Sequence, residues 1–301
     1  MIYGGIEAGG TKFVCGVGDE DGNSLETCTI ATGAPSETLD AVRAFFTQAE
    51  VRHGRCGAFG VASFGPLDLD PLSPGHGSIT RTPKPGWTGV NLLRWTRETF
   101  DRPAAIDTDV NAAAIAENGV PDARALRSLA YVTCGTGIGV GLVVEGRPVH
   151  GMSHPEAGHI LPRRHPAHEG FAGCCPYHGD CYEGLASGPA IIAAWGQSLS
   201  HLPDDHPAWE VEAAYLGQLC ATLVLTVAPQ RIVLGGGVMK QQRLFPMIRE
   251  RVARDLAGYI APLDDPLALD RLIVPPACVE PPGLVGAYGL ARRALGNQPP
   301  R

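Results

Sequence analysis

The chain has 301 residues, of which 44% are hydrophobic and 18% charged, and its formal net charge is −7. This composition is typical of a globular protein, and the acidic balance argues against nonspecific binding to nucleic acid or to an anionic membrane, so neither is expected as a partner. A chain of this length usually exceeds one hydrophobic core. We therefore expect two lobes with a cleft between them.

The N-terminal stretch MIYGGIEAGGTK lacks the basic and apolar regions of a signal peptide. The longest strongly apolar run, residues 219–228, is too short to span a bilayer. We therefore expect a cytoplasmic protein. Of the nine cysteines, six are scattered in apolar contexts and are expected to be buried thiols, whereas Cys174, Cys175 and Cys181 crowd into one loop.

The first third of the chain predicts a β-meander followed by alternating helices and strands. The meander covers residues 1–30, with a Gly-Gly-Thr turn and an Asp-Gly-Asn turn between strands, and Ser36 is expected to cap the helix that follows it. The Pro/Gly-rich residues 65–86 predict a long loop, which usually carries function. The remaining elements of this part are a helix at 39–48, a strand at 56–65, a helix at 90–99, a strand at 104–106 and a helix at 111–118.

A second lobe begins near residues 118–125, and its first segment repeats the pattern of the N-terminus. Residues 131–148, YVTCGTGIGVGLVVEGRP, again read as strand, Gly/Thr turn and strand. This similarity predicts a duplicated domain whose two turns face each other across the cleft. The later segments predict a Cys/His-rich loop at 169–183, a long helix at 209–228, a strand in RIVLGGG, and helices at 243–256 and 284–295. Strands that alternate with helices indicate an α/β fold.

The glycine turns are the first candidate site. A Gly between strands frees backbone N–H groups to converge on an anion, and a neighbouring Thr adds a hydroxyl donor. A single GGT or GTG is more often an ordinary hairpin turn. Two such turns in corresponding places, with the LGGG cluster directly after an apolar strand, favour a nucleotide site instead.

Two further segments carry polar residues with more than one interpretation. Thr108 or Asp109 fits the N-cap of the helix that follows, but a carboxylate there also fits a general base. In SHPEAGH, Glu156 and His159 are spaced to share one face and bind sugar hydroxyls, or they form an exposed turn. We expect Ser63, Gly65 and Asn91 to line another wall of a sugar site.

In GCCPYHGDCYEG, the spacing of Cys175, His178 and Cys181 is typical of a hairpin that wraps one Zn²⁺ ion. The fourth ligand is open on chemical grounds, and the candidates are His154, His159, His165, His168 and Cys174. A disulfide is the alternative, which a reducing cytoplasm disfavours. Because four protein ligands leave no position for water, such a zinc ion is structural.

Taken together, IEAGGTK, TDVNAAA, CGTGIGVG, SHPEAGH, CPYHGDC, EGLASGPA and LGGGVM resemble the signature segments of ROK-family sugar kinases, in particular the bacterial fructokinases. The resemblance covers nearly the whole chain. It implies a two-lobed, actin-like and ribonuclease-H-like α/β fold with mixed sheets flanked by helices. The lobes are then a small lobe at 1–118, with the helix at about 284–301 packing back on it, and a large lobe at 119–283 with the zinc loop.

The resemblance also implies ATP, Mg²⁺ and a structural Zn²⁺ as cofactors, a transferred γ-phosphoryl group, and site roles for named residues. Asp109 is then the catalytic base, with Asn111 supporting the loop, and His159 completes the zinc site of Cys175, His178 and Cys181. Glu156, His159 and Glu183 bind the hexose. Glu7 stands where many relatives have Asp, and it is a candidate for the Mg²⁺ site. The residues implied in ATP binding are Gly9, Gly10, Thr11, Lys12, Thr133, Gly135, Thr136, Gly137, Pro189, Gly235, Gly236 and Gly237.

The expected activity is transfer of phosphate from ATP to the 6-hydroxyl of a hexose, with D-fructose as first choice and mannose or glucose as alternatives. A second class is a sugar-sensing regulator, but the first strand begins at Ile2 and leaves no room before it for a DNA-binding helix-turn-helix. A third is a non-catalytic sugar-binding module, which the presence of Asp109 disfavours. The apolar helices would suit a homodimer.

Overall fold

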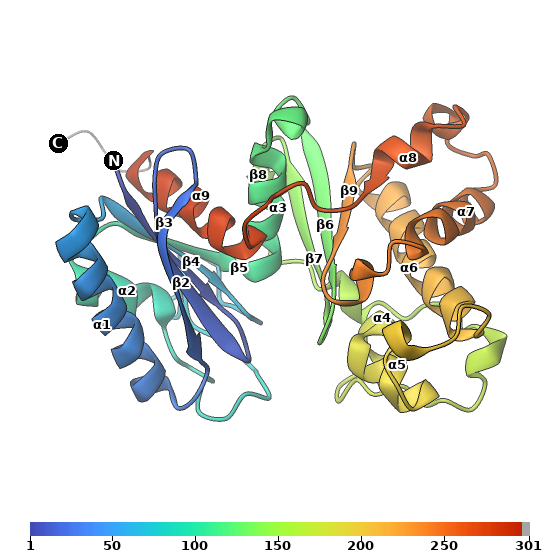
Figure 1. Cartoon of the computed structure of the whole chain (residues 1–301), viewed down its shortest axis with the longest axis horizontal. Helices are drawn as coiled ribbons and strands as arrows, with labels where there is room; N and C mark the ends of the chain where they lie inside the picture. The colour runs from blue at the N-terminus through green and yellow to red at the C-terminus, as the bar shows by residue number, and fades with distance from the viewer. Residues whose placement is uncertain (297–301) are drawn as a thin grey trace. The chain divides into compact units, whose positions relative to one another are not determined.

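The computed structural model describes residues 1–296 and divides the chain into two compact units (Figure 1). The first unit contains residues 1–124, 147–155 and 278 onward, and the second contains 125–146 and 156–277. Residues 147–155, which the sequence analysis places in the second lobe, thus belong to the first unit. The expected C-terminal helix reaches 301, and its last five positions, 297–301, lie outside the described residues.

The first unit is built on a five-stranded mixed sheet in the order β3-β2-β1-β4-β5. The antiparallel β1–β2–β3 meander follows the predicted turns, and β1, β4 and β5 run parallel. The strands are β1 (Tyr3–Ala8), β2 (Lys12–Gly18), β3 (Ser24–Ala31), β4 (Ala58–Ser63) and β5 (Ala104–Thr108).

Helices cover both faces of this sheet. On one face, Phe46 of α1 and Leu92 of α2 share a core with Phe59 of β4. On the other face, Tyr288 of α9 packs against Tyr3 and Val14 of the sheet. Figure 1 shows α9 running beside the sheet in red. The helices are α1 (Pro35–His53), α2 (Leu92–Phe100), α3 (Asp109–Gly119) and α9 (Pro282–Gly296).

Close packing of α9 depends on glycines in α9 and in the strand beside it. A Cβ on Gly60 of β4 would lie 1.8 Å from the carbonyl oxygen of Ala287. A Cβ on Gly286 of α9 would lie 1.9 Å from the carbonyl oxygen of Ala112 in α3. Because backbone atoms cannot rotate away as side chains do, either substitution would force α9 off its neighbours.

A second sheet has the strand order β10-β9-β6-β7-β8, which matches the order of the first sheet when read from β8 to β10. Its strands β6, β7, β9 and β10 belong to the second unit, whereas the two residues of β8 belong to the first. β6 pairs antiparallel with β7 and parallel with β9, as β1 does with β2 and β4. The strands are β6 (Ser128–Cys134), β7 (Ile138–Val144), β8 (Arg147–Pro148), β9 (Ile232–Gly235) and β10 (Ile273–Val274). The repeated strand order has the form of a duplicated domain.

The helices of the second unit follow the expected pattern in part. The long helix is α6 (Ala208–Thr226), and it packs against α7 (Leu244–Leu256) and α4 (Tyr182–Ala186). Three short helices were not predicted from the sequence: α4, α5 (Gly188–Trp195) and α8 (Ala268–Leu272). None of the helices within residues 1–296 combines the length and the apolar character needed to cross a membrane.

One predicted cap is wrong. Helix α1 begins at Pro35, one residue before Ser36, and its N-cap is Ala34, which makes no side-chain cap bond. Proline suits the first turn of a helix because the N–H that it lacks would have no intrahelical partner there.

Candidate active site

The β1–β2 turn presents the first glycine cluster. Gly9 donates from its backbone N–H to the carbonyl oxygen of Lys12 at 3.0 Å, and a Cβ on Gly9 would lie 2.7 Å from that oxygen. Gly10, Thr11 and Lys12 are exposed, and a Cβ on Gly10 would meet nothing within 4 Å. The turn is therefore tight on the inside and leaves polar backbone open on the outside, as anion binding requires.

Asp109 is the first residue of α3, directly after β5. Thr108 takes the N-cap position and accepts a 3.1 Å hydrogen bond from the Asn111 N–H, so Asp109 is not the cap. Oδ1 of Asp109 accepts a 2.9 Å bond from the Val110 N–H. Burial raises the pKa of Asp109 to about 6, against which this backbone hydrogen bond acts. A carboxyl with such a pKa suits proton transfer near neutral pH.

Asp107 has a different environment. It is 2% exposed, and Oδ1 accepts bonds from the Thr108 N–H at 2.8 Å and from Nδ2 of Asn111 at 2.7 Å. Nε2 of His150 lies 3.0 Å from Oδ2, and this hydrogen bond raises the pKa of His150. Asp107 therefore serves to hold Asn111 and His150 in place. His150 was not predicted from the sequence, because it follows Asp107 by 43 residues and no local pattern signals this pairing.

Glu7 is the fifth residue of β1 and comes two residues before the glycine turn. Burial, together with the negative charge of Asp109, raises the pKa of Glu7 to about 7, and Lys12 lowers it. Oε2 of Glu7 is buried and has no hydrogen-bond partner among the described residues. An unpartnered buried carboxylate oxygen next to a second carboxylate has the chemistry of a site for a hydrated divalent cation.

Two residues expected on a sugar-binding wall are instead committed to local structure. Ser63 is fully buried and donates to the Phe64 carbonyl at 2.9 Å. Asn91 caps α2, with Oδ1 accepting from the Arg94 N–H at 2.7 Å and Nδ2 donating to the His76 carbonyl at 2.8 Å. Both side chains therefore support the local backbone.

The Pro/Gly-rich loop that contains Gly65 is tied down by His154. Nε2 of His154 accepts a 3.0 Å hydrogen bond from the Leu67 N–H, and burial lowers the pKa of His154. A Cβ on Gly65 would lie 3.4 Å from this imidazole. The neutral ring is therefore the form that can accept this bond and fix the start of the loop.

In the second unit, the β6–β7 turn holds the other glycine cluster. Gly135 donates to the Gly137 carbonyl at 2.9 Å and accepts from the Gly188 N–H at 2.7 Å. Oε2 of Glu183 accepts a 3.1 Å bond from the Ile138 N–H and lies 2.5 Å from where a Cβ on Gly137 would be. Glu183, expected at the sugar, thus supports the turn from α4.

A cavity of about 400 Å³ opens beside this turn. The implied nucleotide residues Gly135, Thr136, Pro189 and Gly237 line it. Gly235 and Gly236 are not among its lining residues. They lie against β6, where a Cβ on Gly235 would be 2.3 Å from the Tyr131 hydroxyl and a Cβ on Gly236 would be 2.3 Å from the Cys134 carbonyl oxygen. The lining residues that the sequence analysis missed are Gly188, Ile191, Ile192, Ser198, Leu199, Ser200, Val238 and Gln241.

Most of these missed residues belong to or follow α5, whose start does carry a sequence signal. Ser187 caps α5 by accepting a 3.4 Å bond from the Ala190 N–H, and Pro189 lies in the first turn. A Ser before a Gly-Pro pair and an apolar run is a typical helix start. The cavity combines apolar side chains with a few polar groups, as sites for small organic ligands do.

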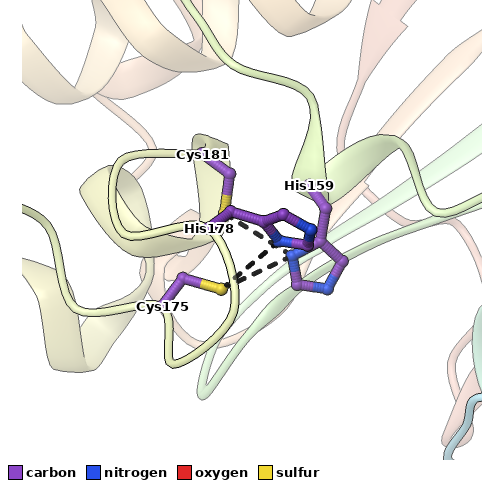
Figure 2. Close-up of side chains that lie close together, drawn as sticks. All are labelled: His159, Cys175, His178 and Cys181. Carbon is purple, nitrogen blue, oxygen red and sulfur yellow. Dashed lines mark hydrogen bonds between the residues drawn. The ribbon is translucent and has the colours of Figure 1, made fainter.

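His159, Cys175, His178 and Cys181 form the metal-ligand cluster, and their ligand atoms all lie within 4.8 Å of one another (Figure 2). Nδ1 of His159 lies 3.7 Å from Sγ of Cys175 and 3.5 Å from Sγ of Cys181, and Nδ1 of His178 lies 3.7 Å from Sγ of Cys175. Tetrahedral zinc with ordinary Zn–S and Zn–N bonds requires N–S separations of about 3.5 Å. The four side chains therefore fit Zn²⁺.

The other residues considered as the fourth ligand lie outside this cluster. Cys174 is exposed, and His154 accepts from Leu67. Nδ1 of His165 accepts from the Ala167 N–H at 3.2 Å, and Nδ1 of His168 lies 3.3 Å from the Tyr215 hydroxyl. The loop is further held by an ion pair of 2.8 Å between Arg164 and Asp180.

Known proteins resemble this chain over nearly its full length. The fructokinase of Zymomonas mobilis is 43% identical over 97% of both chains, and that of Pediococcus pentosaceus is 41% identical over 99% of this chain and 100% of its own. The solved ROK hexokinase of Thermus thermophilus superposes with a TM-score of 0.80 at 27% identity, covering 99% of this chain and 100% of its own.

A Streptomyces griseus ROK-family glucokinase, solved with glucose and AMPPNP, superposes with a TM-score of 0.74 at 24% identity, covering 97% of this chain and 100% of its own. These neighbours share the two-lobed, actin-like α/β fold expected from the sequence. The sequence description of the ROK family matches residues 3–294. The chain therefore belongs to the ROK family.

Proposed function

We propose that this protein is an ATP-dependent fructokinase that phosphorylates D-fructose at its 6-hydroxyl. Two relatives at 41–43% identity over nearly the whole chain are fructokinases, and a more distant neighbour was solved with glucose and an ATP analogue. The observation that carries the chemistry is the contrast between two nearby carboxylates. Both oxygens of Asp107 have hydrogen-bond partners, which include the side chains of Asn111 and His150. Asp109 instead accepts a bond from the Val110 N–H at Oδ1, and burial raises its pKa.

In this proposal Asp109 accepts the proton of the fructose 6-hydroxyl as that oxygen attacks the γ-phosphorus of ATP. In phosphoryl transfer the protein mainly positions the reactants and stabilises charge, and one group accepts the hydroxyl proton. The carboxyl of Asp109 suits this role because its pKa of about 6 leaves it mostly ionised at neutral pH. Glu156, His159 and Glu183 are the proposed sugar-binding residues.

The glycine turns at 9–12 and 135–137 are proposed to bind the phosphates, together with Thr133, and the cavity beside Pro189 and Gly237 to take the adenosine. Mg²⁺, when bound with ATP, neutralises phosphate charge, and Glu7 is the residue that would hold its water shell. The zinc ion is proposed to be structural, because the four protein ligands leave no open position. It would join the turn at His159 to the loop that ends at Glu183.

The direct test is ADP release in the presence of Mg²⁺ with fructose, mannose, glucose and N-acetylated hexoses as separate acceptors. The proposal expects the highest kcat/KM with fructose, and fructose 6-phosphate as the product. A preference for glucose or mannose would assign the protein to another specificity within the family. No transfer to any of these sugars would overturn the proposed activity.

A further inference from the structure

The unpartnered carboxylate of Glu7 lies against a residue at the start of α9. Gly283 is the second residue of α9 (Pro282–Gly296). A Cβ built on Gly283 would lie 2.5 Å from Oε1 of Glu7, 2.6 Å from Cδ and 2.9 Å from Cγ. The space that a side chain at 283 would take is thus already occupied by the carboxylate of Glu7.

The kind of atom in the way decides what a substitution would do. At Gly60 and Gly286 the blocking atoms are backbone carbonyls, which cannot move without displacing an element. At Gly283 the three nearest atoms all belong to the mobile end of one side chain. A methyl group at 283 would therefore displace the carboxylate of Glu7 and leave α9 in place.

We propose that Gly283 is a positioning residue for phosphoryl transfer, because its missing side chain provides the space in which the carboxylate of Glu7 is held at the end of β1, two residues before the glycine turn at 9–12. This inference rests on the proposed function. It follows that Glu at position 7 and Gly at position 283 are matched in size. An Asp at position 7 is shorter by one methylene group. Its carboxylate carbon would take the place of Cγ of Glu7, 2.9 Å from a Cβ at 283, and the closer contacts of Oε1 and Cδ would be lost, so a methyl group at 283 would be accommodated more easily.

The test is a double-mutant cycle of wild type, Gly283→Ala, Glu7→Asp and the combination of the two. In the wild-type background we expect Gly283→Ala to lower kcat and to weaken Mn²⁺ binding to the enzyme–ADP complex, measured by electron paramagnetic resonance, each by about tenfold or more. In the Glu7→Asp background, where only the 2.9 Å contact remains, we expect the same substitution to lower both quantities at least about threefold less than in the wild type. A loss of activity in Glu7→Asp alone does not affect the test, because the cycle compares the effects of Gly283→Ala in the two backgrounds.

The control is Gly119→Ala at the end of α3, where a Cβ would meet nothing within 4 Å and both quantities should stay unchanged. Thermal unfolding without ligands should show that Gly283→Ala retains the melting temperature of the wild type within a few degrees. Equal losses in both backgrounds, or no loss in either, would overturn the inference. If the wild type phosphorylates no hexose, the proposed function fails, and the Mn²⁺ cycle still decides whether residues 7 and 283 are coupled.

Discussion

Asp107 accepts a 2.7 Å hydrogen bond from the side chain of Asn111, one turn further along the chain, and faces His150 with its other oxygen. Through these bonds Asp107 holds the start of α3, whose first residue is Asp109. The two carboxylates are two residues apart in sequence but differ in environment. The separation of their roles follows from the hydrogen-bond donors around each.

Replacing Asp109 with Asn removes the proposed proton acceptor and keeps the size of the side chain. We expect kcat to fall by about 10²–10⁴-fold, because general base catalysis contributes on that scale, while fructose binding measured by calorimetry stays within about threefold. Asp21→Asn is the matched control, since Asp21 is exposed in the β2–β3 turn. Turnover near the wild-type level in Asp109→Asn would contradict the assignment of the base.

The pKa of Asp109 predicts the acid limb of the pH profile. Because the base acts when ionised, kcat/KM for fructose should decline as the pH falls through about 6, the pKa of Asp109 in the free enzyme. The profile should be measured with Mg²⁺–ATP well below its KM, so that it reports the free enzyme. A profile that stays flat down to pH 5 would show that another group takes the proton.

The raised pKa of Asp109 also predicts that ionisation of this carboxyl, which activity requires, lowers the stability of the folded protein. A carboxyl whose pKa is raised by folding destabilises the native state when it is ionised, so the penalty is absent below the unfolded pKa near 4 and fully present above about 6. Asp109→Asn should therefore be more stable than the wild type by about 1–3 kcal/mol at pH 8 and equal to it near pH 4. Urea unfolding of the ligand-free proteins at the two pH values measures this. Equal stability at pH 8 would mean that Asp109 is well solvated.

The sequence reveals much of this fold because the informative patterns are local. The strand and turn alternation of residues 1–30 and the apolar run of α6 each lie within one segment. The spacing of Cys175, His178 and Cys181 is local too, so the clustering of these side chains could be predicted directly. The duplicated strand order was visible because the same strand, turn and strand pattern occurs in both halves.

Contacts between distant segments were not predictable in this way. The pairing of Asp107 with His150 depends on residues 147–155 joining the first unit, and the contact of Glu7 with Gly283 joins opposite ends of the chain. The cavity walls from α5 were missed because a short apolar helix has little periodicity to read.

Removal of the metal should reduce stability and activity together. Cys175→Ser takes away one thiol of the cluster, so the variant should not retain the proposed zinc ion and should unfold about 5–10 °C lower, as the loss of roughly 3 kcal/mol would produce in a chain of this size. Cys174→Ser is the matched control, because the neighbouring thiol is exposed and lies outside the cluster. Zinc content is measured by elemental analysis. Full activity in a verified zinc-free protein would contradict the role given to the ion.

The cavity beside α5 gives a prediction that separates nucleotide from sugar binding. A Cβ on Gly237 meets nothing within 4 Å, and Gly237 lines the cavity, so Gly237→Val should fill part of it without disturbing the fold. We expect KM for ATP to rise by about tenfold or more, with KM for fructose within about twofold of wild type. Should KM for fructose rise instead, the cavity would belong to the sugar.

The most direct test of the account compares wild type and Asp109→Asn in a single experiment with fructose, ATP and Mg²⁺, in which ³¹P NMR follows the products. The account predicts that the wild type forms fructose 6-phosphate and ADP in equal amounts, and that the variant binds fructose but forms them at least about a hundredfold more slowly. Formation of the phosphate ester by the variant at the wild-type rate, or its absence with the wild type, would contradict the account.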